Sequence, residues 1–158
     1  MGSGLHLLPS SDEPVLLLRL LFAVLAGGAI GWNRYRAGKP AGAGTHALVA
    51  LGAALFVIIP AQTSLGQAGD ALSRAIQGVA TGVGFLGAGE IFRDPGDGSR
   101  IRGLTSAAAL WATAAVGIIA ACGSWVTVVA AIFLVLAILV FAPRLEHRFP
   151  SRPEGPPR

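Results

Sequence analysis

The chain has 158 residues, of which 53% are hydrophobic and 13% are charged, and its formal net charge is +4. Soluble domains carry charge on about a quarter of their residues, so this chain has too little polar surface to form a water-soluble globule. The orientation of the helices in the membrane accounts for the excess of basic residues. No basic surface interleaved with aromatic residues remains to bind nucleic acid. Composition therefore predicts an integral membrane protein and excludes a soluble enzyme.

Five hydrophobic segments follow one another along the chain. A hydrocarbon core about 30 Å thick needs about 20 mostly apolar residues in one helix, and each segment is near that length. Glycine, proline or charged residues separate the segments at 33–44, 62–70, 93–102 and 122–124. The expected fold is therefore all-α, a bundle of about five transmembrane helices with these bounds: Val15 to Trp32, Thr45 to Ala61, Ala71 to Phe92, Gly103 to Ala121 and Ser124 to Ala142.

The positions of the basic residues predict the orientation of the bundle. Short cytoplasmic loops hold an excess of Lys and Arg, and most of the 12 basic residues follow the first, third and fifth segments. These are Arg34, Arg36, Lys39, Arg93, Arg100, Arg102, Arg144, Arg148, Arg152 and Arg158. We expect residues 1–14 to be a short extracytoplasmic N-terminus, 15–142 the membrane domain, and 143–158 a disordered Pro/Arg-rich cytoplasmic tail.

Polar residues near the outer ends of the helices form the first candidate site. Charge inside a membrane is costly, so each charged residue there needs a partner or a use. Arg19 lies one turn into the first helix, and Asp70 and Arg74 begin the third. Arg19 is expected either to extend outward to the headgroups or to pair with Asp70.

A larger polar group is expected at the inner ends, near the cytoplasmic boundary. One interpretation is a small polar cavity in which an anion or a partner's carboxylate faces the helix N-termini at Thr45 and Gly103. The other is ordinary capping by Thr45 and Thr105, with Glu90 pairing with Arg93 or Arg34. The members are Asn33, Arg34, Thr45, His46, Glu90, Arg102, Thr105 and Ser106.

The third segment contains the densest run of small residues. At 100° per residue, Ala71, Ala75, Gly78, Gly82 and Gly89 share one narrow face, a pattern that lets helix backbones approach closely. This face is predicted to be a packing seam, within the bundle or between protomers. The proposed helix-packing residues are Gly78, Gly82, Gly84, Gly87 and Gly89. The run also matches a dinucleotide-binding fingerprint, but it lacks the preceding strand which that fingerprint requires.

The sequence contains no recognisable catalytic or metal site. Three scattered histidines and the single cysteine form no zinc pattern. His46 and Glu90 are the one titratable pair expected at a common depth, and they lack a nucleophile beside them. We therefore expect a protein that is not an enzyme and that uses no metal or cofactor.

Three segments, KPAGAGTHALVALGAALF, GVGFLGAGEIFR and RGLTSAAALWATAAVGI, resemble signature segments of the MgtC/SapB membrane proteins in the same order. The resemblance covers Arg19 to about Gly123 and implies a multi-pass protein of the bacterial inner membrane linked to adaptation to low magnesium and, in some members, to virulence. It also implies a modulator of other membrane machinery, with ATP synthase and magnesium pumps as proposed partners. A soluble C-terminal domain found in longer relatives is not expected here.

Three positions depart from the family pattern. The family motif GLERE has an acid where this chain has Asn33, and AGLRTH has an arginine where it has Gly44. Conversely, Glu90 replaces an apolar residue of GAGVI. We hypothesise that Glu90 substitutes for the lost carboxylate and meets Arg34.

Two functions from different classes follow from these residues. The first is a regulatory protein that contacts a partner complex, or a second copy of itself, along the glycine face of the third helix. The alternative is an ion channel or transporter, for magnesium or another ion, whose mouth is the inner polar layer. Magnesium prefers carboxylates and several waters, and Glu90 is the one acid expected near the core of the spans.

Overall fold

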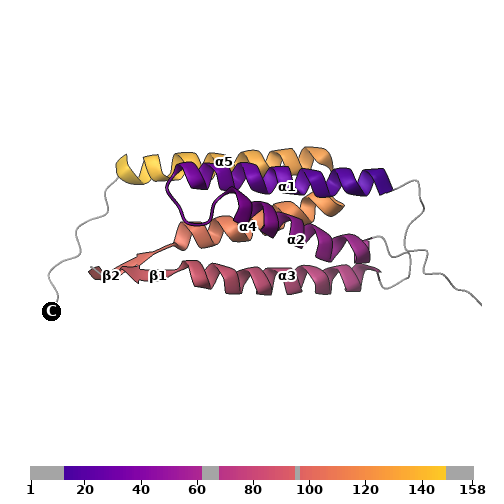
Figure 1. Ribbon diagram of the computed structural model, residues 1–158, viewed down its shortest axis with the longest axis horizontal. Helices are drawn as coiled ribbons and strands as arrows, with labels where there is room; N and C mark the ends of the chain where they lie inside the picture. Colours follow the sequence, from indigo (N-terminus) through magenta and orange to yellow (C-terminus); the bar gives the residue numbers. More distant parts are fainter. Residues whose placement is uncertain (1–12, 62–67, 95–96, 149–158) are drawn as a thin grey trace, which may run out of the picture.

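The computed structural model describes residues 13–61, 68–94 and 97–148 (Figure 1). Within these ranges the chain is a bundle of five helices with one two-stranded hairpin, which confirms the all-α membrane fold class. The elements are α1 (Glu13–Arg36), α2 (Ala43–Ala61), α3 (Ala68–Glu90), β1 (Phe92–Asp94), β2 (Asp97–Arg102), α4 (Leu104–Cys122) and α5 (Trp125–Arg148).

Several helix ends differ from the predicted ones. The first helix continues past Trp32 to Arg36, and the chain then turns at Gly38, whose φ of +68° suits glycine. Between α3 and α4 the antiparallel strands β1 and β2 stand where only a break was expected. The last helix passes through Pro143 and ends at Arg148 rather than at Ala142, so 143–148 are helical. The rest of the predicted tail, 149–158, lies outside the described residues.

Four of the five helices in the described part of the chain are long and apolar enough to cross a membrane: α1, α2, α4 and α5. The third helix is long enough but falls short in apolar character. Its composition gives the reason, because Ser73, Arg74, Gln77 and Thr81 interrupt a sequence already rich in glycine. Its prediction as a span of the same kind as the others is therefore not supported by hydropathy.

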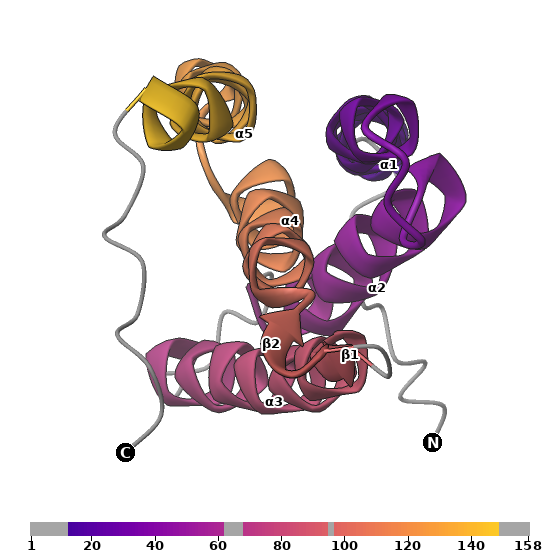
Figure 2. The same ribbon diagram turned by 90° about the vertical axis from the view of Figure 1, so that its left-hand side faces the viewer.

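Helices α1, α2 and α4 pack against one another at the centre of the bundle. On one side, α3 lies against α2 and α4; on the other, α5 lies against α4 and α1 (Figures 1 and 2). Small side chains dominate the buried core, among them Ala23, Ala26, Ala50, Ala54 and Ala120. Such residues let helix axes approach closely, which is how helices associate in a membrane, where burial of apolar surface gives little driving force.

Among the described residues, close helix packing at glycine occurs where α1 and α4 meet α2, not along α3: an added methyl group at Gly117 of α4 would collide with the carbonyl oxygen of Ala50. A methyl group added at Gly27 would collide with the carbonyl oxygen of His46, and one at Gly31 would lie 2.5 Å from the Gly42 oxygen. On α3, Gly87 contacts Ala107, whereas a side chain at Gly78, Gly82, Gly84 or Gly89 would meet nothing within 4 Å. The α3 glycines thus do not form a packing seam within one chain, apart from Gly87.

Candidate functional site

Three polar side chains from three different helices are buried together at one end of the bundle. Arg34 of α1 is 3% exposed, His46 of α2 is 0% exposed and Ser106 of α4 is 3% exposed. Arg34 lies in the last turn of its helix, while His46 and Ser106 lie in the first turns of theirs. Helices α2 and α4 both run opposite to α1, so their first turns lie at the level of its last turn (Figure 1). The predicted inner layer has this arrangement.

Arg34 joins α1 to α4 directly. Its Nη2 donates a hydrogen bond of 2.8 Å to Oγ of Ser106. The Nε of the same guanidinium is buried and has no hydrogen-bond partner. The cation lies at the N-terminal end of α4, whose dipole disfavours it, and in the last turn of α1, whose dipole favours it.

His46 is held by the loop that precedes its own helix. Its Nδ1 lies 3.0 Å from the carbonyl oxygen of Gly42, and since a carbonyl can only accept, Nδ1 carries the proton and donates it. In the neutral ring Nε2 is then an acceptor, and it is buried without a partner. Gly27 and Gly31 of α1 lie close to the backbone oxygen and Cβ of His46, respectively, so α1 packs directly against this turn of α2.

Glu90 acts on the cluster through its charge. This half-buried residue ends α3, and its carboxylate interacts electrostatically with both Arg34 and His46. Within the described residues Arg34 makes its side-chain hydrogen bond to Ser106 and forms no ion pair with Glu90. The hypothesised meeting of Glu90 with Arg34 is thus not a direct contact; whether Glu90 substitutes for a lost carboxylate stays a hypothesis.

The remaining inner-layer candidates, on α1, α2, β2 and α4, lie outside this buried cluster. Asn33 is half-buried, and Thr45, Arg102 and Thr105 are exposed. Gly103 is the N-cap of α4, with φ of +92° and no side-chain cap hydrogen bond, so the capping expected of Thr105 is not seen. Arg93 lies among residues whose side chains the structure does not describe.

At the opposite end of the bundle, Arg19 binds the C-terminal end of α4. Its Nη1 donates hydrogen bonds to the carbonyl oxygens of Ala120 at 3.1 Å and Gly123 at 3.0 Å. The guanidinium also lies 5.3 Å from the ring centroid of Trp125. Both contacts favour a cation, because carbonyls left free at a helix C-terminus carry negative charge and an aromatic face attracts positive charge. The predicted pairing with Asp70 is not formed; Asp70 and Arg74 are exposed on α3.

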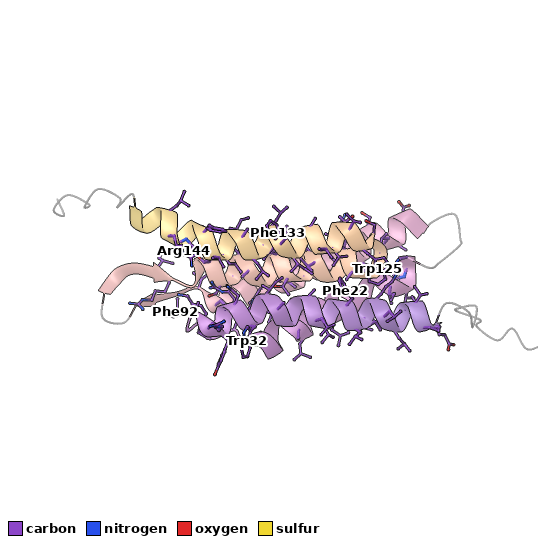
Figure 3. The ribbon with its side chains drawn as sticks, turned by 90° about the horizontal axis from the view of Figure 1, so that it is seen from above. Phe22, Trp32, Phe92, Trp125, Phe133 and Arg144 are labelled. Atoms are coloured by element: carbon purple, nitrogen blue, oxygen red, sulfur yellow. The ribbon has the colours of Figure 1, made fainter. Side chains whose placement is uncertain are left out.

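Aromatic packing fixes the position of Trp125. The ring of Phe22 meets it edge-on, with centroids 5.3 Å apart and planes at 89°. Figure 3 shows this pair at one end of the molecule and Trp32 and Phe92 at the other. Sequence reasoning missed the Arg19 contacts, because backbone carbonyls carry no residue-specific signal.

An apolar groove of about 780 Å³ runs between α2 and α3. Its residues recur every three or four positions along both helices, which indicates that one continuous stripe of each helix forms each wall. Gly78 and Gly82 line this groove on its α3 side, and a Cβ added at either would meet nothing within 4 Å. The lining is Thr45, Leu48, Val49, Gly52, Ala53, Phe56, Ala75, Gly78, Val79, Gly82, Val83 and Leu86.

The fold and these sites define a multi-pass helical membrane protein with a small internal polar cluster and an apolar lateral groove. A model of the MgtC family matches residues 20–148, and the chain belongs to this family. No solved structure matches the chain.

Three relatives illustrate the likeness. The chain is 48% identical to Protein SrpB of Synechococcus elongatus, over 89% of this chain and 81% of SrpB. It is 36% identical to Protein MgtC of Salmonella typhimurium, over 90% of this chain and 60% of MgtC. With YhiD of Escherichia coli (strain K12), a candidate magnesium transporter by its name, identity is 42% over 69% of this chain and 52% of YhiD. The chain thus spans only part of the longer relatives.

Proposed function

We propose that this chain serves magnesium homeostasis in the bacterial inner membrane by binding and modulating another membrane complex, and that it catalyses no reaction. The family and the name of the relative YhiD support the link to magnesium. The proposed partner is an ATP synthase or a magnesium pump. The N-terminus lies outside and the C-terminus inside, in keeping with the positions of the basic residues.

The groove between α2 and α3 carries this proposal. It is apolar, open on one side, and lined by glycines at which an added side chain would meet nothing within 4 Å, namely Gly52, Gly78 and Gly82. A transmembrane helix of a partner fits such a surface, because small residues let a second backbone approach closely. Lateral binding of a helix needs no water path and no reacting group.

Filling the groove tests the proposal. Gly78→Leu and Gly82→Leu place bulky side chains in the groove without a clash inside the chain. Gly28→Leu is the matched control, since Gly28 also lies in a helix with nothing within 4 Å but stands outside the groove. We expect the two groove variants, and not the control, to lose co-purification with the pump or synthase and to lose growth at low magnesium. Unchanged capture by both groove variants would contradict the proposal.

Transport of an ion is the second candidate, favoured by the name of YhiD. Its mouth would be the cluster of Arg34, His46 and Ser106. Purified chain in liposomes loaded with a magnesium-sensitive dye distinguishes the two functions. Modulation predicts no flux above that of empty liposomes, whereas flux that is lost in Arg34→Gln would establish transport.

A further inference from the structure

The outward face of α3 carries a row of polar side chains. Ser73, Gln77 and Thr81 are all exposed, and their spacing of four residues places them one above the other on the helix. Within the row, Nε2 of Gln77 donates to Oγ of Ser73 at 3.4 Å, and Oγ1 of Thr81 donates to the backbone oxygen of Gln77 at 2.9 Å. We call Ser73, Gln77 and Thr81 the α3 polar row.

This row lies at the depth of the membrane. The groove brings residues 75–86 of α3 beside residues 45–56 of α2, and α2 is one of the apolar spans. The two helices run in opposite directions (Figure 1). The groove lining therefore puts Thr81 level with the middle of α2 and Gln77 about one turn nearer the N-terminal end of α3. Hydrocarbon offers these side chains no hydrogen bonds, so a row facing lipid would be costly.

The row is not fully satisfied by its own helix. In the hydrogen bonds of the described residues the amide oxygen of Gln77 accepts none, although an amide oxygen has two lone pairs. At the outer end of the same face, Asp70 and Arg74 are exposed and form no ion pair with each other. One face of α3 thus presents donors, acceptors and both signs of charge.

We propose that this face of α3 packs against the same face of a second copy of the chain, with both copies in the same orientation. In such a pair a two-fold axis along the membrane normal brings each row beside its equivalent. Amides and hydroxyls both donate and accept, so a row of them complements itself. Opposite charges one turn apart complement themselves in the same way, with Asp70 of each copy facing the other copy's Arg74.

The small residues that continue this face support close packing. Gly84 and Ala88 extend it toward the inner end, both exposed and small, and the exposed ring of Phe85 stands at its edge. The face is distinct from the α2–α3 groove, so the pair leaves the groove free. The inference therefore does not depend on the proposed function.

Cysteine crosslinking of the full chain in its own membrane tests the pairing. The single native cysteine is first replaced by Cys122→Ser. Gln77→Cys is then compared with Phe133→Cys, which lies about as far along α5 and is 70% exposed (Figure 3). On oxidation we expect a disulfide-linked dimer from Gln77→Cys and none from Phe133→Cys. Equal crosslinking at both positions, or none at either, would overturn the proposal.

A second measurement addresses other occupants of the face. In lipid nanodiscs, Gln77→Leu should weaken self-association by about threefold to tenfold, since polar contacts between membrane helices are individually modest. A monomeric mass for the unaltered chain would refute the pairing. So would crosslinking of Gln77→Cys only to another protein. Rapid reaction of uncrosslinked Gln77→Cys with a membrane-impermeant thiol reagent would show instead that this face lines water.

Discussion

Nη2 of Arg34 donates a hydrogen bond of 2.8 Å to Oγ of Ser106 and so connects the last turn of α1 to the first turn of α4. Both side chains are almost entirely buried. The Nε of the same guanidinium is buried without a hydrogen-bond partner. Loss of the Ser106 hydroxyl would therefore leave a second nitrogen of this cation unsatisfied. The contact should therefore matter more for stability than a surface hydrogen bond does.

Ser106→Ala tests this expectation. Loss of a buried hydrogen bond to a charged group should lower the free energy of unfolding by about 1.5–3 kcal/mol. The measurement is thermal unfolding of the purified protein in detergent, followed by tryptophan fluorescence. Thr105→Ala is the neighbouring control; because Thr105 is exposed, its effect should stay within about 0.5 kcal/mol. Equal losses would show that the hydroxyl of Ser106 has no special role.

The close approach of α1 to α2 makes a prediction for two glycines of one helix. In Gly31→Ala the new methyl group would lie 2.5 Å from the Gly42 oxygen and 2.7 Å from Cα of Ala43. Overpacking of this kind should cost about 1–3 kcal/mol. Gly28→Ala meets nothing within 4 Å and should stabilise α1 by about 0.5–1 kcal/mol. In chemical denaturation, changes of opposite sign in the free energy of unfolding of the two variants would establish the close contact between α1 and α2. Changes of the same sign would argue against it.

Arg19 and Arg36 lie near opposite ends of α1, so the stability contributed by each cation can be compared on one helix. Arg19→Met removes two hydrogen bonds to carbonyls and the contact with Trp125. We expect a loss of about 1–2 kcal/mol, because the site is part-buried and at a helix C-terminus. The exposed cation of Arg36 should contribute less than about 1 kcal/mol. If Asp70→Asn lowered the melting temperature as much as Arg19→Met, an ion pair with Asp70 would be the better explanation.

The N-cap of α4 depends on a glycine conformation. Gly103 has φ of +92°, and an added Cβ would collide with the backbone oxygen of Glu90. A side chain in left-handed backbone costs about 1–2 kcal/mol before any clash is counted. Gly103→Ala should therefore lower the melting temperature, whereas Gly52→Ala in open space should not. The same scan that measures Ser106→Ala serves here, and a neutral Gly103→Ala would contradict the cap geometry.

The level of a residue along the bundle could be predicted from the sequence, but the face of the helix on which its side chain lies could not. Arg34, His46 and Ser106 were placed in one layer from the order of apolar segments, and the structure brings Arg34 and Ser106 into contact. Thr45 and Thr105 share that layer yet are exposed. The direction in which a side chain faces depends on which helices are neighbours, and one sequence does not specify those neighbours.

The glycine patterns show the same limit. The third segment has more glycines than the first, so it was expected to provide the packing seam. Close packing occurs instead at Gly27 and Gly31 of α1 and at Gly117 of α4, because these two helices lie against α2 at the centre of the bundle. Similarly, the sequence predicts that Arg19 extends to the headgroups or pairs with Asp70, whereas its ligands are carbonyl groups that any residue could have supplied.

The contacts of Arg19 also set an order for biogenesis. Arg19 belongs to α1, which is made before α4 and α5, and its ligands Ala120, Gly123 and Trp125 are made about a hundred residues later. Until then its charge has none of its final neighbours, so the N-terminal helix cannot complete its packing during early insertion. The Arg19 end of α1 therefore completes its packing only after the α4–α5 hairpin has entered the bilayer, and a nascent chain truncated before residue 120 should leave that end unpacked.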